Sequence, residues 1–315
     1  MHLENKLTIL VNSCDAYEDL WLPFFTLLKR YGNIPGVQIL LNTESKTFSM
    51  EGLEIHCIHP PRGTQYGGRI LCALDSVKTE YVLMMLDDFF LRRPLNAEHI
   101  GKLLDWMDAD PQIACFNSEK VNCYAPWEKD RYPGYTRIPP ANSYACNMQA
   151  AVWRTDKLKK YWRPRVSPWE WEEYCSLLTA RFTEDKLYCR TENGQNWIDY
   201  GHNTTGDLWA VVRGKWIISD VKALFEREHI AVDFSQRGIY LDSEMKAVSS
   251  GETKRGAYIS RIARCLGMSS VCAYISYRLR RMTCMNSQEQ RLEFLEYIQE
   301  KAKRRFLEKQ REYNE

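Results

Sequence analysis

The sequence predicts an α/β fold with a mostly parallel sheet, and three observations lead to this prediction. Apolar runs of strand length alternate with amphipathic helical segments through roughly the first 90 residues. Residues 81–86 are apolar at nearly every position, as in a strand that is covered on both faces. That run ends in two adjacent acids, Asp87 and Asp88, at the edge where open α/β sheets bind their ligands.

The first third of the chain supplies four strands and three helices. A strand at 7–11 is followed by a helix at 18–31, and Pro23 is expected in the first turn of that helix. Gly36 and the Pro60-Pro61 pair mark turns around the next two strands. The remaining predicted elements are strands 37–41, 53–58 and 81–86 and helices 67–77 and 97–108.

A long polar and aromatic loop divides the rest of the first 240 residues. It follows a strand at 113–116 and runs from 117 to 143, a length typical of a lid or binding loop. Beyond the loop we expect strands 148–153 and 209–213 and helices 156–161, 169–181 and 219–228. Residues 1–240 are therefore predicted to form the main domain.

The tail, residues 241–315, is predicted to be a helical extension. Its stretch 254–281 carries basic residues and no acidic one, with apolar residues between them. Two interpretations are open: contact with an anionic membrane surface, or a helix packed on the main domain with its charges in water. A last helix is expected at 288–313.

Composition excludes several classes of function. A net charge of +2 does not indicate a nucleic-acid partner, and no run approaches the roughly 20 apolar residues of a membrane span. The eleven cysteines are scattered and form no C-x-x-C pair, so we expect reduced thiols and no zinc site. The N-terminus lacks the apolar stretch of a secretory signal, which predicts a location inside the cell.

The acid pair has two interpretations. Asp87 and Asp88 are either solvated in a surface turn or buried together. Burial of two unpaired carboxylates is costly, and a divalent cation bridging them to a phosphate would remove that cost.

Seven motifs resemble those of bacterial glycosyltransferases with the GT-A fold. They are D-A-Y-E-D-L-W-L-P-F-F at 15–25, L-N-T-E at 41–44, K-T-E-Y-V at 78–82, L-D-D-F-F at 86–90, N-M-Q-A-A-V-W at 147–153, P-W-E-W-E at 168–172 and V-R-G-K-W at 212–216. The resemblance covers roughly residues 7–240 and is closest to family 2-like enzymes of capsule and O-antigen biosynthesis. It implies a Rossmann-like GT-A sheet, a nucleotide-sugar donor (a UDP-sugar in the first instance), a glycan or lipid-linked glycan acceptor, and Mn²⁺ or Mg²⁺. The family's metal motif is commonly Asp-x-Asp, whereas this chain has two adjacent acids.

Sugar transfer needs positive charge at the departing diphosphate. Asp88 is predicted to be a metal ligand, and Asp87 to hold the donor ribose or a metal-bound water. Ser13, Asp15 and Tyr17 follow the first strand, where the resemblance places the nucleobase. For Asp15 a second interpretation is open, as N-cap of the following helix.

Two basic residues are further candidates for the donor phosphates. Arg69 lies at the start of a predicted helix, and Lys215 follows the strand at 209–213. For each the alternative is a solvated surface charge.

The acceptor hydroxyl must lose a proton to a carboxylate. The resemblance points to Glu172 or Glu170 as this base, with inversion at the anomeric carbon, although acids at a helix start also suit the helix dipole. Contacts to the acceptor or sugar are predicted for four nearby side chains: Asn147, Gln149, Trp169 and Trp171.

The sequence thus predicts a cytoplasmic glycosyltransferase, acting at the inner face of the plasma membrane if the basic stretch binds lipid. Two alternatives are a sugar-phosphate nucleotidyltransferase and a binding protein for glycans or nucleotide sugars without turnover. The first is disfavoured because the loop after the first strand, Asn12-Ser13-Cys14-Asp15, has neither Gly nor Arg.

Overall fold

A computed structural model describes residues 2–32, 34–121, 123, 131–140, 142, 144–179, 182, 184–201 and 210–240. Met1–Ile239 form one compact unit. The predicted helical extension, with the basic stretch 254–281 and the last helix, lies outside the described residues. In the part that is described, no helix is long and apolar enough to cross a membrane.

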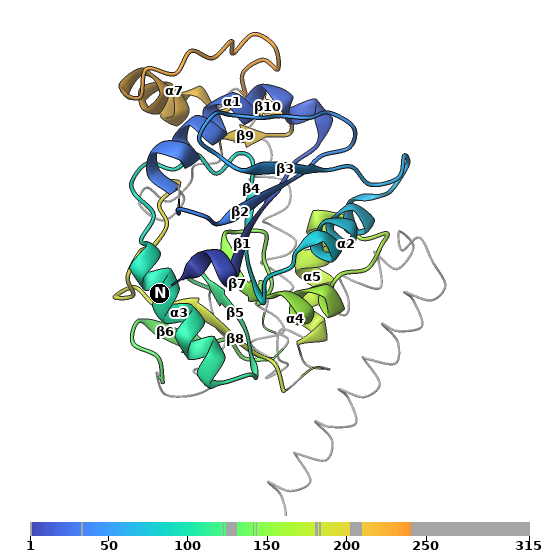
Figure 1. Cartoon of the computed structure of the whole chain (residues 1–315), viewed down its shortest axis with the longest axis vertical. Coiled ribbons are helices and arrows are strands. Elements are labelled where there is room, and N and C mark those ends of the chain that lie inside the picture. The colour runs from blue at the N-terminus through green and yellow to red at the C-terminus, as the bar shows by residue number, and fades with distance from the viewer. Residues whose placement is uncertain are drawn as a thin grey trace, which may run out of the picture. The chain divides into compact units, whose positions relative to one another are not determined.

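The compact unit is a layered α/β fold around an eight-stranded sheet, with helices on both faces (Figure 1). This confirms the predicted Rossmann-like fold class. The strands are β1 (Leu7–Asn12), β2 (Gln38–Asn42), β3 (Ile55–Ile58), β4 (Tyr81–Leu86), β5 (Ile113–Asn117), β6 (Tyr135–Arg137), β7 (Ala151–Arg154) and β8 (Lys186–Arg190). The helices are α1 (Glu18–Leu27), α2 (Tyr66–Ser76), α3 (Ala97–Ala109), α4 (Thr155–Tyr161), α5 (Pro168–Leu178) and α7 (Ile218–Arg227). A two-stranded ribbon pairs β9 (Val211–Val212) with β10 (Lys215–Trp216).

The strand order across the sheet is β3-β2-β1-β4-β7-β5-β8-β6. From β1 the chain moves outward to β2 and β3, then returns to the other side of β1 as β4, and all these pairs are parallel. The strand order therefore reverses between β1 and β4, the position where open α/β sheets bind ligands. Next to β4 lies β7, which is antiparallel to both β4 and β5.

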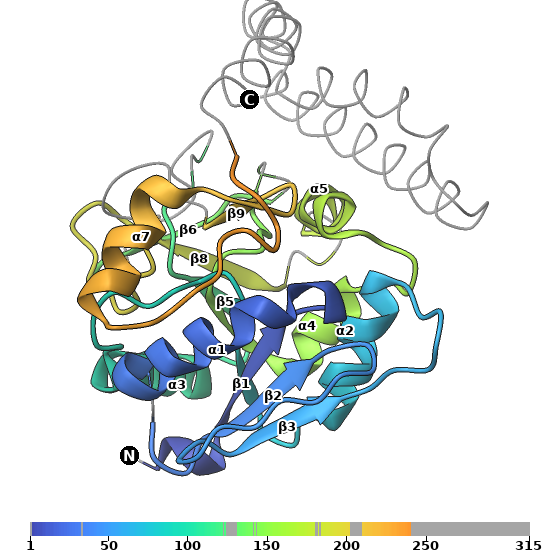
Figure 2. The same ribbon diagram turned by 90° about the horizontal axis from the view of Figure 1, so that it is seen from above.

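The core has two halves, one on each face of the sheet. Alternate side chains of a strand point to opposite faces, so Ile9 and Leu83 pack on one side while Leu10 and Met84 pack on the other. The first half is closed by α1, α3 and α7, and the second by α2, α4 and α5 (Figure 2). Burial on both faces explains why β1 and β4 are apolar throughout.

The first half of the sheet matches the sequence prediction closely, and the second half departs from it. The strand predicted at 148–153 begins only at Ala151, and residues 144–150 form the turn before it. The predicted loop 117–143 contains β6, and β8 was not predicted. Pro23 lies in the second turn of α1 because that helix begins at Glu18, so the prediction of the first turn is wrong.

The prediction that all cysteines are reduced thiols is also wrong. Cys146 and Cys175 form a disulfide between the turn before β7 and helix α5. Six further cysteines within the described residues are free.

Candidate functional site

The ends of β1 and β4 lie side by side at the point where the strand order reverses. Asn12 pairs in register with Leu86, so the residues that follow them, Ser13 and Asp87, are neighbours. The Ser13 hydroxyl donates a hydrogen bond to Asp87 Oδ2, and it accepts one from Trp21 Nε1 at 2.7 Å. Ser13 therefore fixes the orientation of Asp87.

The acid pair is largely shielded from water, which contradicts the solvated interpretation: Asp87 is buried and Asp88 is half-buried. Asp87 is 5% exposed, and Asp88 Oδ1 is buried with no hydrogen-bond partner in the structure. Burial, followed by repulsion from Asp88, raises the pKa of Asp87 well above its usual value, against the hydrogen bond from Ser13. Burial also raises the pKa of Asp88, to about 6. Two adjacent buried acids with an unsatisfied oxygen are expected where a cation binds.

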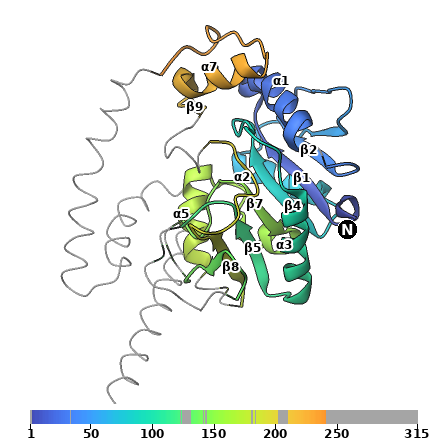
Figure 3. The same ribbon diagram turned by 90° about the vertical axis from the view of Figure 1, so that its left-hand side faces the viewer.

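Arg237 is a positively charged residue that acts on both acids: its charge lowers the pKa of Asp87 and of Asp88. Its Nε donates to Asp19 Oδ2 at 2.8 Å, and its Nη2 pairs with Asp19 Oδ1. The guanidinium also stacks over the ring of Tyr17, 4.5 Å from the centroid. Through these contacts the segment after α7 is held against the start of α1, and α7 lies beside α1 (Figure 3). No sequence pattern singles out Arg237, because Asp19 and Tyr17, the partners that bring it to this site, are more than 200 residues away.

Asp15 organises the loop that follows β2. Its carboxylate accepts hydrogen bonds from the backbone N–H groups of Glu44, Ser45 and Lys46 and from the Ser45 hydroxyl. Burial opposes ionisation, but these hydrogen bonds lower the pKa of Asp15 below its usual value. The N-cap interpretation is wrong, because α1 begins after Tyr17 without a side-chain cap. The loops after β1 and β2 are thereby tied together.

Arg69 lies in the first turns of α2 and is 8% exposed. It forms an ion pair with Glu44 Oε1 at 2.7 Å, and its guanidinium stacks over Tyr66. Tyr66 is close to the acid pair: burial raises its pKa, and the charges of Asp87 and Asp88 raise it further. The solvated-charge interpretation of Arg69 is therefore wrong.

Lys215 lies on β10, where it pairs with Val212 of β9.

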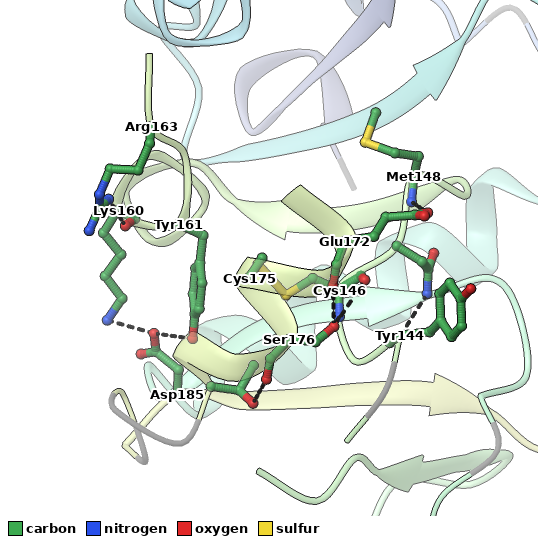
Figure 4. The surroundings of a disulfide bond; sticks show 12 residues. Tyr144, Cys146, Met148, Lys160, Tyr161, Arg163, Glu172, Cys175, Ser176 and Asp185 are labelled. Carbon is green, nitrogen blue, oxygen red and sulfur yellow. Dashed lines mark hydrogen bonds and ion pairs between the residues drawn. A yellow bond between two sulfur atoms is a disulfide. The ribbon is translucent and has the colours of Figure 1, made fainter. Parts of the chain in front are cut away.

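A second group of predicted residues lies around the start of α5 (Figure 4). Glu172 Oε1 accepts a hydrogen bond of 2.8 Å from the backbone N–H of Met148, so this carboxylate is held against the turn before β7. The side chain of Glu170 lies outside the described residues. Trp169 is 70% exposed.

Trp171 is fully buried, and its ring stacks on Trp162 with a centroid distance of 4.4 Å. It has no face open to a ligand, so the prediction that it binds sugar is corrected: Trp171 belongs to the core. Helical periodicity explains the difference from Trp169, since Trp171, Cys175 and Leu178 recur on one buried face of α5.

Asn147 and Gln149 lie in the turn before β7, not on a strand. The Asn147 side chain braces this turn, donating to the Tyr144 carbonyl and accepting from the Gln149 N–H. Gln149 Oε1 accepts a hydrogen bond of 2.9 Å from the hydroxyl of Tyr200.

Two contacts connect this turn to the acid pair. Phe89, the residue after Asp88, stacks on Tyr200 with ring centroids 4.3 Å apart. The Tyr200 hydroxyl then reaches Gln149, and also Glu119 Oε1 at 2.9 Å. Because β7 is antiparallel to β4, the turn at its start lies at the same edge of the sheet as the end of β4. Sequence reasoning missed Tyr200, which follows no predicted strand. It also missed Glu119, which lies at the start of the long loop predicted after the strand at 113–116.

The acid pair suits a hard dication. Among the described residues no cluster of three or more His, Cys, Asp or Glu side chains could hold a metal ion. One or two carboxylates are nevertheless what Mg²⁺ usually takes from a protein, with water and substrate phosphates completing its coordination. The unsatisfied Asp88 Oδ1 is an oxygen of the kind that such an ion binds.

No protein-family model and no curated protein sequence matches the chain. Among solved structures, a structure of S. aureus TarS 1–349 is 11% identical with a TM-score of 0.40, covering 61% of this chain and 59% of that one. A second S. aureus TarS structure is 12% identical with a TM-score of 0.40, covering 60% and 36%. CMP:2-keto-3-deoxy-manno-octonic acid synthetase complexed with CTP is 14% identical with a TM-score of 0.32, covering 59% and 88%. The chain spans less than two thirds of either TarS structure, and likenesses this low indicate no function.

Proposed function

We propose that this protein is a glycosyltransferase that moves a sugar from a nucleotide-sugar donor, a UDP-sugar in the first instance, to a hydroxyl of a surface-glycan precursor. The observation that carries the proposal is the acid pair after β4, with Asp87 buried and Asp88 half-buried, beside the end of β1 where the strand order reverses. Asp88 Oδ1 has no hydrogen-bond partner there. The motifs that resemble GT-A glycosyltransferases include this pair.

The metal part of the proposal assigns Asp88, with Asp87 beside it, to hold Mn²⁺ or Mg²⁺. When bound, the ion would supply positive charge to the diphosphate of the donor as it departs. Ser13 keeps Asp87 oriented through its hydrogen bond. Arg237 adds a fixed positive charge that favours ionisation of both acids.

The nucleotide part of the site is assigned to the loops after β1 and β2. Tyr17 would pack against the base, with its ring held by Arg237 at 4.5 Å. Asp15 would act by organising the two loops, because its carboxylate already accepts hydrogen bonds from three backbone N–H groups and one hydroxyl. Arg69 and Lys215 are proposed to contact the phosphates.

The acceptor part is assigned to the turn before β7 and the start of α5. Glu172, or alternatively Glu170, would accept the proton of the attacking hydroxyl, and the sugar would be transferred with inversion. Trp169 offers an exposed aromatic face to a sugar ring, and Asn147 and Gln149 lie in the adjoining turn. A lipid-linked acceptor, with the stretch 254–281 at the inner face of the plasma membrane, belongs to the same proposal.

The test is nucleotide release. Purified protein would be incubated with Mn²⁺ and a panel of UDP-, GDP- and CMP-sugars, with and without EDTA, and the free nucleotide measured. Asp88→Asn is the diagnostic variant because it keeps the side-chain shape and removes the charge. Glu98→Gln is the matched control, since Glu98 is an exposed carboxylate on α3 that forms an ion pair with Lys102.

We expect metal-dependent release that falls at least 100-fold in Asp88→Asn and is unchanged in Glu98→Gln. Donor binding without release would favour a binding protein over an enzyme. Pyrophosphate formed from a nucleoside triphosphate and a sugar phosphate would instead indicate a nucleotidyltransferase, and the glycosyltransferase proposal would then be abandoned.

A further inference from the structure

A disulfide joins the two segments that carry the acceptor side of the site. Cys146 lies in the turn before β7 and Cys175 lies in α5, 29 residues further along the chain. Figure 4 shows the Cys146–Cys175 disulfide with Glu172, Met148 and Tyr144 around it. Both cysteines are fully buried.

The disulfide is surrounded by hydrogen bonds between the same two segments. Ser176 Oγ accepts the backbone N–H of Cys146 at 3.1 Å, and Glu172 Oε1 accepts that of Met148 at 2.8 Å. The Ser176 hydroxyl also lies 2.5 Å from the backbone carbonyl oxygen of Glu172. Four links therefore connect residues 146–148 to α5: the two N–H hydrogen bonds, a 3.3 Å contact of the Ser176 hydroxyl with the Cys146 carbonyl oxygen, and the disulfide. Only the disulfide is covalent.

From this arrangement we propose that Cys146 and Cys175 are positioning residues: their disulfide holds Glu172 against the turn before β7. Its oxidation state then controls transfer to the acceptor without controlling donor binding. The donor side depends on different contacts, chiefly those of Ser13 with Asp87, of Asp15 with the loop after β2, and of Arg237 with Asp19. The link between Glu172 and transfer rests on the proposed function, whereas the effect of the disulfide on the turn does not.

The redox step is a thiol–disulfide exchange. A low-molecular-weight dithiol such as dithiothreitol delivers two electrons and two protons, so that Cys146 and Cys175 become thiols and the reductant becomes a cyclic disulfide. Oxidation reverses the step. Because both sulfurs are buried, the exchange requires local opening of the turn, and we expect it to be slow without mild denaturant.

The disulfide itself can be tested by mass spectrometry. Trypsin should release residues 138–154 and 166–181 as peptides that each contain a single cysteine, Cys146 in the first and Cys175 in the second. After free thiols are alkylated under denaturing conditions without reductant, the two peptides should be found linked. Recovery of both peptides in alkylated form would overturn the proposal.

Positioning can be tested by hydrogen exchange, which does not require activity. In the oxidised protein the amides of Cys146 and Met148 should be protected, because they donate to Ser176 and Glu172. Reduction, or the double variant Cys146→Ala/Cys175→Ala, should speed their exchange at least tenfold. Cys72→Ser, at a free cysteine on α2, is the control and should change nothing. Unchanged protection after reduction would overturn the proposal.

Kinetics test the consequence for transfer. We expect reduction to lower kcat or raise the acceptor KM at least tenfold, while the Kd for Mn²⁺ and UDP stays within twofold. The proposal that the disulfide controls the acceptor side would be overturned by either of two results. One is a loss of donor binding on reduction as large as the loss of transfer, and the other is a transfer rate that reduction does not change. If the oxidised protein shows no transfer at all, the proposed function fails, and the exchange measurement still decides whether the disulfide positions Glu172. Should the alanine variant not fold, the wild-type protein with and without dithiothreitol gives the same comparison.

Discussion

Replacement of Asp88 by Asn should make the metal-free protein more stable at neutral pH. The side chain is partly buried and its Oδ1 has no hydrogen-bond partner, so its charge is poorly solvated in the folded state. Burial raises its pKa from 3.8 to about 6, and one pKa unit corresponds to about 1.4 kcal/mol. The full shift would be worth about 3 kcal/mol. Since Asp87 is coupled to the same group and Asp88 is only partly buried, we expect a gain of about 1–3 kcal/mol.

The sign of the effect depends on pH in a defined window. Above about pH 6 the Asp88 carboxylate is ionised in both the folded and the unfolded protein, but its charge is poorly solvated only in the folded protein, whose stability it lowers. As pH falls from about 6 to 3.8, the folded protein takes up a proton before the unfolded chain does, so the cost disappears. The advantage of Asp88→Asn should therefore be complete at pH 7 and absent below pH 3.8.

The assay is urea or thermal unfolding followed by circular dichroism in EDTA, at pH 7 and near pH 4. The Tm should rise by roughly 2–4 °C for each kcal/mol. Added Mn²⁺ and UDP should reverse the ranking, because a ligand at 100 times its Kd stabilises the protein that binds it by about 2.7 kcal/mol. Glu98→Gln should remain within about 0.5 kcal/mol of wild type throughout.

Two results would refute this reasoning. A less stable Asp88→Asn protein at pH 7 in EDTA would mean that the buried carboxylate has partners that the structure does not contain. Equal stabilisation of wild type and variant by Mn²⁺ and UDP would place the cation away from Asp88.

Three further predictions concern other parts of the fold. The pKa of Glu228 is lowered to about 2, against burial, by hydrogen bonds from two arginines and a tyrosine. The stability that ionised Glu228 contributes should therefore be present above pH 4.5 and lost towards pH 2. Glu228→Gln should lower the free energy of unfolding in urea by about 1–2 kcal/mol at pH 7 and by little at pH 2. The cost is set at this modest level because the two arginines that bind Glu228 are partly exposed. Arg237→Gln should raise the pKa of the acid pair further and move the acidic limb of metal-dependent nucleotide release to higher pH, and an unshifted limb would contradict this. Trp171→Ala should cost about 3–5 kcal/mol in unfolding free energy, whereas Trp169→Ala should change stability by less than about 0.5 kcal/mol and raise the acceptor KM; equal destabilisation by the two would contradict the core assignment.

The parts of the fold that could be predicted are those encoded in local pattern. The parallel strands β1 to β4 are short apolar runs separated by helices, and the acids after β4 stand where a buried strand must end. The buried face of α5 could also have been found, because Trp171, Cys175 and Leu178 follow the helical period. The alternation of Trp and Glu along the sequence obscures that signal.

Other features depend on partners that are distant in the chain. The direction of β7 is decided by its pairing with β4 and β5, and no residue within β7 specifies it. From the sequence alone Asp15 is predicted to cap a helix. In the folded chain its carboxylate instead accepts hydrogen bonds from four donors of the loop after β2. Arg237 is an isolated charge in the sequence, and only the folded chain brings it to Asp19 and Tyr17. The disulfide requires two cysteines whose elements meet only after α5 packs on the sheet.

The reversed direction of β7 has a consequence for how this protein can diversify. At the edge of the sheet where β4 ends, each parallel strand is followed by the loop that leaves it. Because β7 is antiparallel, the loop at this edge is the one that leads into β7. Under the proposed function, the turn assigned to the acceptor is therefore supported by a strand that shares none of its connections with β1, β2 or β4. Positions of this turn other than Cys146 and Asn147, which hold it in place, can then accumulate substitutions that suit a new acceptor while the loops assigned to the nucleotide are left untouched.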